Sequence, residues 1–181
     1  MTTTVEVFEG VYEADQAHSS FEAEVRHMGV GSFRTRFEDV TARLTAGRDG
    51  LRLQGRAAVE SVAIRQPVEF REHVVYGADF FDARNHPHIA FNSDEMTLSE
   101  DGSVNLTGQL TIRGVSRPIS ATGTYRAPVQ DPYGATRAGL DLNATVDRRD
   151  FGMNWQTELP NGGNVLEWDV ALDVHLELVQ R

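Results

Sequence analysis

A period-two alternation of apolar and polar residues runs through most of this chain and constrains its fold more than any other feature. The clearest run covers residues 165–179, where one face consists of Leu166, Trp168, Val170, Leu172, Val174, Leu176 and Leu178. Residues 104–112 and 140–147 alternate in the same way. Because successive side chains of a strand point to opposite faces, this period predicts strands with one buried face.

Weaker alternation predicts further strands at residues 10–14, 20–27, 33–45, 51–62, 88–98 and 115–126. Turn-forming runs separate the predicted strands, among them Gly47-Arg48-Asp49-Gly50 and Asp131-Pro132-Tyr133-Gly134. Residues 65–75 do not alternate. They carry Pro67 near their start and apolar residues at helical spacing, which predicts one short helix.

The tight turns and long strands together indicate a fold class. Strands joined by tight turns are antiparallel, and long strands coil, so that about eight of them close into a barrel. We therefore predict an all-β fold, an eight-stranded antiparallel barrel with one short helix around residues 65–75. A two-sheet sandwich is the alternative. Since the chain has no linker, repeat or low-complexity stretch, residues 1–181 are expected to form a single domain.

The composition argues against several classes of protein. The formal net charge of −10 disfavours binding to nucleic acid and to anionic membranes. The absence of cysteine excludes disulfides and thiolate chemistry. Residues 1–10 lack the pattern of a signal peptide, and no apolar stretch approaches the length of a membrane span. The sequence as it stands predicts a cytoplasmic protein without stable membrane insertion.

Two aromatic features are candidates for ligand contact. Phe80 and Phe81 are adjacent and flanked by acids, so they are expected either to plug one end of the barrel or to line a cavity as well. Trp155 and Trp168 each combine a large apolar area with a polar tip, and either could belong to the core or touch a ligand.

The run from Asp147 to Gly152 ends a predicted strand and pairs acids with arginines. A structural ion network is one interpretation. The other is that Arg148 faces the head group of a ligand, where its fork of donors suits an oxygen-rich group.

His18 and His27 bracket a predicted strand. Their nine-residue separation would direct them to opposite faces of one strand, so no metal site is expected, and both are predicted to form hydrogen bonds at the barrel mouth. No catalytic or nucleotide-binding motif is present, and the chain is predicted not to be an enzyme.

Several segments, in order along nearly the whole chain, resemble the YceI-like family. The matching segments are residues 12–19 with Phe21, Val25 and His27; residues 33–37 with Ser61; residues 79–83; residues 87–91 with Ser93; residues 108–115 with Pro118; and residues 146–152. Thr35 stands where that family usually has glycine.

The resemblance implies a lipocalin-like barrel that binds a polyisoprenoid or other long amphiphilic chain, with no catalysis firmly tied to the fold. No cofactor is expected, and an isoprenoid lipid or a quinone is the expected bound molecule. The predicted ligand-binding residues are His18, Phe21, His27, Phe33, Phe80, Phe81, Phe91, Arg148, Phe151, Trp155 and Trp168.

Two functions remain open at this stage. The first is a lipid-binding module for storage, transport or sequestration of an isoprenoid. The second is a small-barrel enzyme that acts on an apolar substrate with acid–base chemistry from His18, His27 or Asp147. The final strand, if its edge is exposed, could also pair across a homodimer.

Overall fold

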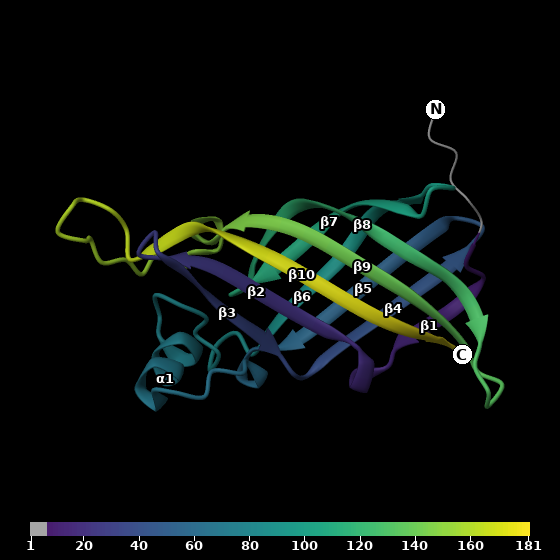
Figure 1. Cartoon of the computed structure of the whole chain (residues 1–181), viewed down its shortest axis with the longest axis horizontal. Helices are drawn as coiled ribbons and strands as arrows, with labels where there is room; N and C mark the ends of the chain where they lie inside the picture. The colour runs from purple at the N-terminus through teal and green to yellow at the C-terminus, as the bar shows by residue number, and fades with distance from the viewer. Residues whose placement is uncertain (1–6) are drawn as a thin grey trace.

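The computed structural model describes residues 7–181, and a ten-stranded sheet dominates it (Figure 1). The strands are β1 (Gly10–Ala14), β2 (Ser20–His27), β3 (Gly31–Phe37), β4 (Val40–Gly47), β5 (Gly50–Ala58), β6 (His88–Leu98), β7 (Ser103–Ile112), β8 (Val115–Gln130), β9 (Thr136–Asp147) and β10 (Leu166–Gln180). The helical segments are η1 (Gln16–His18), η2 (Val59–Ser61), α1 (Val68–Tyr76) and η3 (Arg148–Phe151).

Eight of these strands close into an antiparallel barrel. Strands β4 to β10 follow one another in space, each antiparallel to the next. Strand β1 pairs with β4 on one side and with β10 on the other, which closes the ring. The predicted all-β, eight-stranded antiparallel barrel is thus confirmed, and the sandwich alternative is wrong.

The β2–β3 hairpin lengthens the barrel at one end. Strand β1 lies opposite residues 178–180 of β10, and β2 lies opposite residues 166–175, so the two strands follow one another along β10 with η1 between them. Beyond β2, β3 has no further strand partner along its length in the described residues. Its outer side is approached instead by residues 59–87, the cap segment, which carries α1 (Figure 1). Ala63 N donates to Arg36 O at 2.8 Å there.

Several sequence-based boundaries need correction. The predicted strands over residues 115–126 and 140–147 are longer, as β8 and β9. The predicted strand over residues 33–45 bends at Glu38 and Asp39 and becomes β3 and β4. The predicted strand over residues 51–62 ends at Ala58, and η2 begins at the next residue, Val59. The predicted helix over residues 65–75 begins only at Val68, because Pro67 is extended (ψ 154°) and a residue before proline avoids the helical region.

The final strand does not offer a free edge. Strand β10 pairs with β9 along one side and with β1 and β2 along the other. The expectation that its edge is exposed for pairing in a homodimer is therefore wrong, because barrel closure occupies both edges.

The interior contains two apolar clusters, one toward each end. The cluster near β1 is tightly closed: Leu44, Leu98, Leu140 and Leu178 have no exposed surface. Phe8 packs edge-on against Tyr12 in this cluster, with ring centroids 5.3 Å apart. The other cluster lies toward the β2–β3 hairpin and the cap segment. Buried side chains therefore fill the end near β1, and internal space lies between the two clusters and toward the other end.

Candidate ligand cavity

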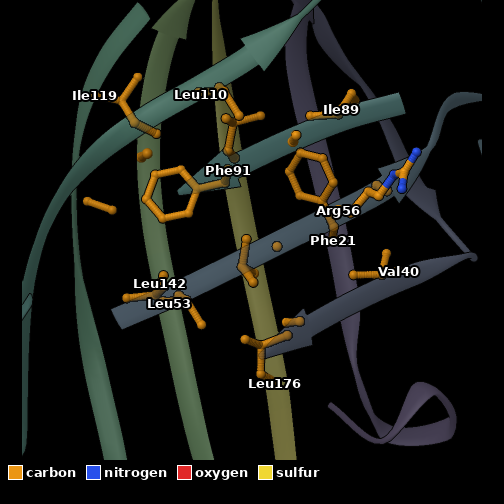
Figure 2. A pocket seen from close by; sticks show the side chains of 18 of the residues that line it. Phe21, Val40, Leu53, Arg56, Ile89, Phe91, Leu110, Ile119, Leu142 and Leu176 are labelled. Atoms are coloured by element: carbon orange, nitrogen blue, oxygen red, sulfur yellow. The ribbon is translucent and has the colours of Figure 1, made fainter. Parts of the chain in front are cut away.

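Two cavities, each of about 100 Å³, lie inside the barrel. Cavity 1 occupies the middle of the barrel, and its lining comes from both apolar clusters (Figure 2). Cavity 2 lies between the β2–β3 hairpin, the cap segment and η3. Phe21, Ile89 and Leu172 line both cavities and are called the waist. The two spaces thus meet at shared side chains.

Cavity 1 exists because small residues occupy lining positions. These residues are Ala42, Gly55, Ala57, Ala121 and Ala144, from strands β4, β5, β8 and β9. Larger residues at the same positions would fill the space, as protein interiors otherwise pack to crystal-like density. The rings of Phe21 and Phe91 lie on either side of the space that the larger aliphatic side chains enclose (Figure 2).

The guanidinium of Arg56 does not point into cavity 1. It extends away from the two phenylalanine rings (Figure 2), and its Nη2 lies 2.8 Å from Nδ1 of His88 at the exposed surface. The wall of cavity 1 is therefore almost entirely apolar. It suits an apolar chain, and the Arg56 guanidinium is not placed to bind a charged group there.

Cavity 2 has an aromatic wall. Phe33 meets Phe70 of α1 edge-on at 5.5 Å, and Phe37 meets Phe81 edge-on at 5.9 Å. Both contacts join β3 to the cap segment, in the edge-to-face arrangement that aromatic pairs prefer. The polar side chains in the lining are those of Thr35 and Arg148.

Arg148 is buried, with 4% of its surface exposed, and it is held by backbone carbonyl groups. Its guanidinium donates to Met153 O at 2.8 Å and Trp155 O at 2.7 Å, and also to Glu167 O and Leu166 O at 3.0 and 3.2 Å. Burial lowers the pKa of Arg148 from its ordinary value. These bonds fix the segment between η3 and β10 against the barrel.

A match to the YceI-like domain spans residues 12–178, nearly the whole chain. This chain belongs to the YceI-like family. Relatives with similar sequences include a UPF0312 protein of Pseudomonas putida, 29% identical over 61% of this chain and 54% of the relative. A UPF0312 protein of Vibrio campbellii is 25% identical over 94% of this chain and 87% of the relative. The chain thus spans about half the length of the first of these relatives.

Solved structures of other proteins share the fold. BcnA of Burkholderia cenocepacia superposes with a TM-score of 0.71 at 21% identity, covering 93% of this chain and 99% of that chain. A polyisoprenoid binding domain from Saccharophagus degradans superposes with a TM-score of 0.66 at 12% identity, covering 96% and 100%. In residues 7–181, no helix has both the length and the apolar character to cross a bilayer.

Seven of the eleven residues predicted to bind ligand line a cavity in this YceI-like barrel. Phe91 lines cavity 1, Phe21 lines both cavities, and cavity 2 is lined by Phe33, Phe80, Phe81, Arg148 and Phe151. Their contact with a ligand stays a prediction. Arg148, however, has most of its donors engaged with the backbone, which supports the structural interpretation of this residue more than a role in binding a head group.

The other four predicted residues, His18, His27, Trp155 and Trp168, lie outside both linings. His27 ends β2, in register with Leu166. Trp155 stacks on Phe80 at 5.6 Å, behind the cavity wall. The indole ring of Trp168 makes cation–π contacts with two arginines. The guanidinium carbons of Arg148 and Arg149 lie 4.3 and 4.8 Å from its ring centroid.

His18 lies in η1 and not along a strand, so the argument from strand alternation does not apply to it. The structure brings Asp15, His18 and Glu177 together, with potential ligand atoms within 4.8 Å of one another. Arg137 already bridges the two carboxylates, with Nη1 2.9 Å from Asp15 Oδ2 and 2.6 Å from Glu177 Oε1. Arg137 and His18 lower the pKa of Asp15 to about 2. The cluster is an ion network near the seam between β1 and β10.

Sequence reasoning missed most of the aliphatic lining. The missed set includes Ile89, Leu110, Leu142, Leu172, Val174 and Leu176. Alternation marks many of these positions as inward-facing, so the signal was present. Small residues also occupy inward-facing positions, such as Gly55 and Ala121. Their small side chains were a further sign in the sequence that the barrel interior is not completely filled.

Proposed function

We propose that this protein binds a long apolar or amphiphilic chain of the isoprenoid type inside its barrel, for storage, transport or sequestration. The observation that carries the proposal is the pair of apolar cavities that meet at the waist. A cavity of about 150 Å³ lined by aliphatic and aromatic side chains accepts benzene. Each cavity here is smaller, so a long chain has to occupy both and pass the waist.

Energetics and fold likeness support this function. Each methylene group buried in an apolar site contributes about 0.8 kcal/mol, so a few isoprene units bind well without polar contacts. The likeness to the domain from Saccharophagus degradans, which is described as polyisoprenoid binding, points to the same ligand class.

The alternative of a small-barrel enzyme finds less support. The candidate acids and bases are His18, His27 and Asp147, and none of them is in the lining of either cavity. Asp147 instead accepts hydrogen bonds from Arg149; the backbone N of Arg149 lies 2.9 Å from Oδ1 of Asp147. General acid–base catalysis requires such groups within hydrogen-bond reach of the substrate.

Extraction of the freshly purified protein with organic solvent, followed by mass spectrometry, tests the proposal directly. A bound long-chain lipid at near-stoichiometric amount is the expected result. A parallel test compares binding of geranylgeraniol by the wild type and by Gly55→Val. Gly55 lines cavity 1, and a Cβ there would lie 3.9 Å from Thr41 O, an ordinary contact, so the valine side chain is expected to enter the cavity.

Gly55→Val is expected to weaken geranylgeraniol binding by about ten-fold, since it displaces roughly two methylene groups. Thr122→Val is the matched control, because Thr122 lies exposed on the outer face of β8 and should leave binding unchanged. Equal affinity in all three proteins would place the ligand elsewhere and contradict the proposal.

A further inference from the structure

A ligand that occupies the barrel interior needs a route into it. Fully buried leucine side chains pack the end near β1. Around the ring, strands β4 to β10 and β1 are joined by continuous antiparallel pairing, which leaves no gap in the side wall. A bound chain therefore has to enter and leave through the end that carries cavity 2.

One wall of that end, the segment between η3 and β10, is held firmly. The buried guanidinium of Arg148 donates to four backbone carbonyl groups of this segment and of the start of β10. The side chain of Gln156 adds two more bonds: its Oε1 accepts from Val165 N at 3.0 Å, and its Nε2 donates to Leu166 O at 2.6 Å. Movement of this wall would leave several buried polar groups without partners, which is costly.

The cap segment, by contrast, is an insertion whose two ends meet. Val59 N donates to Pro87 O at 2.9 Å, next to Ala58 and His88, the last paired residues of β5 and β6. Helix α1 lies outside the ring of strands (Figure 1). A loop of this kind, with close ends, can swing without breaking the pairing of the strands that it connects.

Residues 64–86 of the cap segment are well bonded among themselves. Phe81 N donates to Val74 O at 3.1 Å, and Ala83 N donates to Val75 O at 2.8 Å. These bonds hold residues 81–83 on helix α1. The inner part of the cap segment is therefore expected to move as one body.

Two hydrogen bonds join residues 64–86 to the rest of the described chain. Arg113 Nη2 donates to Ala78 O at 2.7 Å, and Trp155 N donates to Asp79 O at 3.3 Å. Arg113 lies in the β7–β8 turn, and its Nη1 also donates to Gly152 O, so it joins the barrel, the cap segment and the end of η3. Apolar and aromatic packing makes up the rest of this boundary.

We infer that the cap segment is a lid through which the ligand enters and leaves, and that Arg113 holds this lid closed. The inference rests on the proposed function. Opening would expose the rings of Phe70, Phe80 and Phe81, so the closed state is favoured between binding events. Arg113 is in the lining of neither cavity, so it acts on the rate of ligand exchange and not on affinity.

The first test removes the bond from Arg113. Uptake of tritiated geranylgeraniol from phosphatidylcholine vesicles, and its release to them, are measured for the wild type and for Arg113→Met, which keeps the apolar stem. Both rates are expected to rise about ten-fold with affinity unchanged, because the empty and loaded closed states lose the same bond. Arg117→Met is the matched control, since Arg117 is exposed on β8 and its guanidinium donates to the neighbouring Ser116 O.

The second test locks the lid. The chain has no cysteine, so the double variant Asp79→Cys, Trp155→Cys forms a single disulfide between lid and barrel. The control is Val11→Cys, Arg181→Cys at the end near β1, where Arg181 N donates to Val11 O at 2.8 Å. Residues joined by a backbone hydrogen bond lie within the roughly 4–7 Å between Cα atoms that a disulfide spans.

The oxidised lid variant is expected to lose the ligand exchange that its reduced form shows, and reductant should restore it. The oxidised control should exchange ligand like its reduced form. Equal rates in the oxidised and reduced lid variant would overturn the lid, and rates unchanged by Arg113→Met would overturn the role of Arg113. Both results would leave the proposed function standing, whereas failure of the wild type to bind geranylgeraniol would count against that function itself.

Discussion

The ring of Phe91 lies across Gly108 on the neighbouring strand, so closely that a Cβ on Gly108 would come within 2.5 Å of Phe91 Cζ. It would also collide with the backbone oxygen of Asn92. Gly108 is buried on β7, and Phe91 lines cavity 1. The missing side chain therefore determines where the phenyl ring rests, and with it one wall of the cavity.

Gly108→Ala is expected to destabilise the fold by about 1–3 kcal/mol, the usual cost of overpacking a core. The added methyl group should also push Phe91 into cavity 1 and weaken binding of geranylgeraniol. Urea unfolding and ligand titration measure the two effects. Gly47→Ala is the control, because a Cβ at Gly47 meets nothing within 4 Å. Equal stability of both variants would show that the ring moves freely.

Phe21→Leu is expected to widen the waist. Phe21 stacks on Phe37 with ring centroids 5.0 Å apart and lines both cavities. Loss of the stacked pair and of part of the ring should cost about 1–2 kcal/mol of stability. Because the waist becomes wider, the longest ligands in a series of isoprenoid alcohols should gain affinity relative to the shortest. A uniform change along the series would show that the waist does not limit chain length.

Arg148→Lys is expected to cost about 2–4 kcal/mol of unfolding free energy, measured in urea. A lysine ammonium cannot reproduce the planar fork, so several buried carbonyl groups would lose their donors. Arg149→Lys is the matched control. Arg149 is exposed and pairs with Asp147 at the surface, so its substitution should change stability little. Comparable losses in the two variants would refute the structural role of Arg148.

Asp15 should make stability depend on acidic pH. Its pKa is about 2 in the folded protein, against an ordinary value of 3.8. Between these values the unfolded chain binds more protons, so this contribution is complete above about pH 4 and is lost as the pH falls towards 2. Asp15→Asn should flatten this part of the unfolding profile, whereas Asp49→Asn in the exposed β4–β5 turn should not. A profile unchanged by Asp15→Asn would argue against the Arg137 network as its source.

The fold was largely predictable because alternation is a local signal. In β7 and β10 the order of apolar and polar residues alone shows which face is buried. Long strands joined by tight turns leave unpaired edge strands unless the sheet closes into a barrel. The same alternation marked Leu110 and Leu172 as inward-facing before any contact was known. The splitting of residues 33–45 at Glu38 was not predictable, because the bend depends on where β1 ends and β2 begins along β10.

The site depended on contacts between residues far apart in the chain. Asp15 and Glu177 meet only because β1 and β10 form the seam of the barrel, and Arg148 meets its carbonyl partners only once the segment before β10 folds back. The sequence alone shows which side chains point inward, since that follows from the two-residue period. Only the closed structure shows that small residues from β4, β5, β8 and β9 line the same space and leave it unfilled. The volume of a cavity depends on the side chains of several strands together, so the residues of one strand do not reveal it.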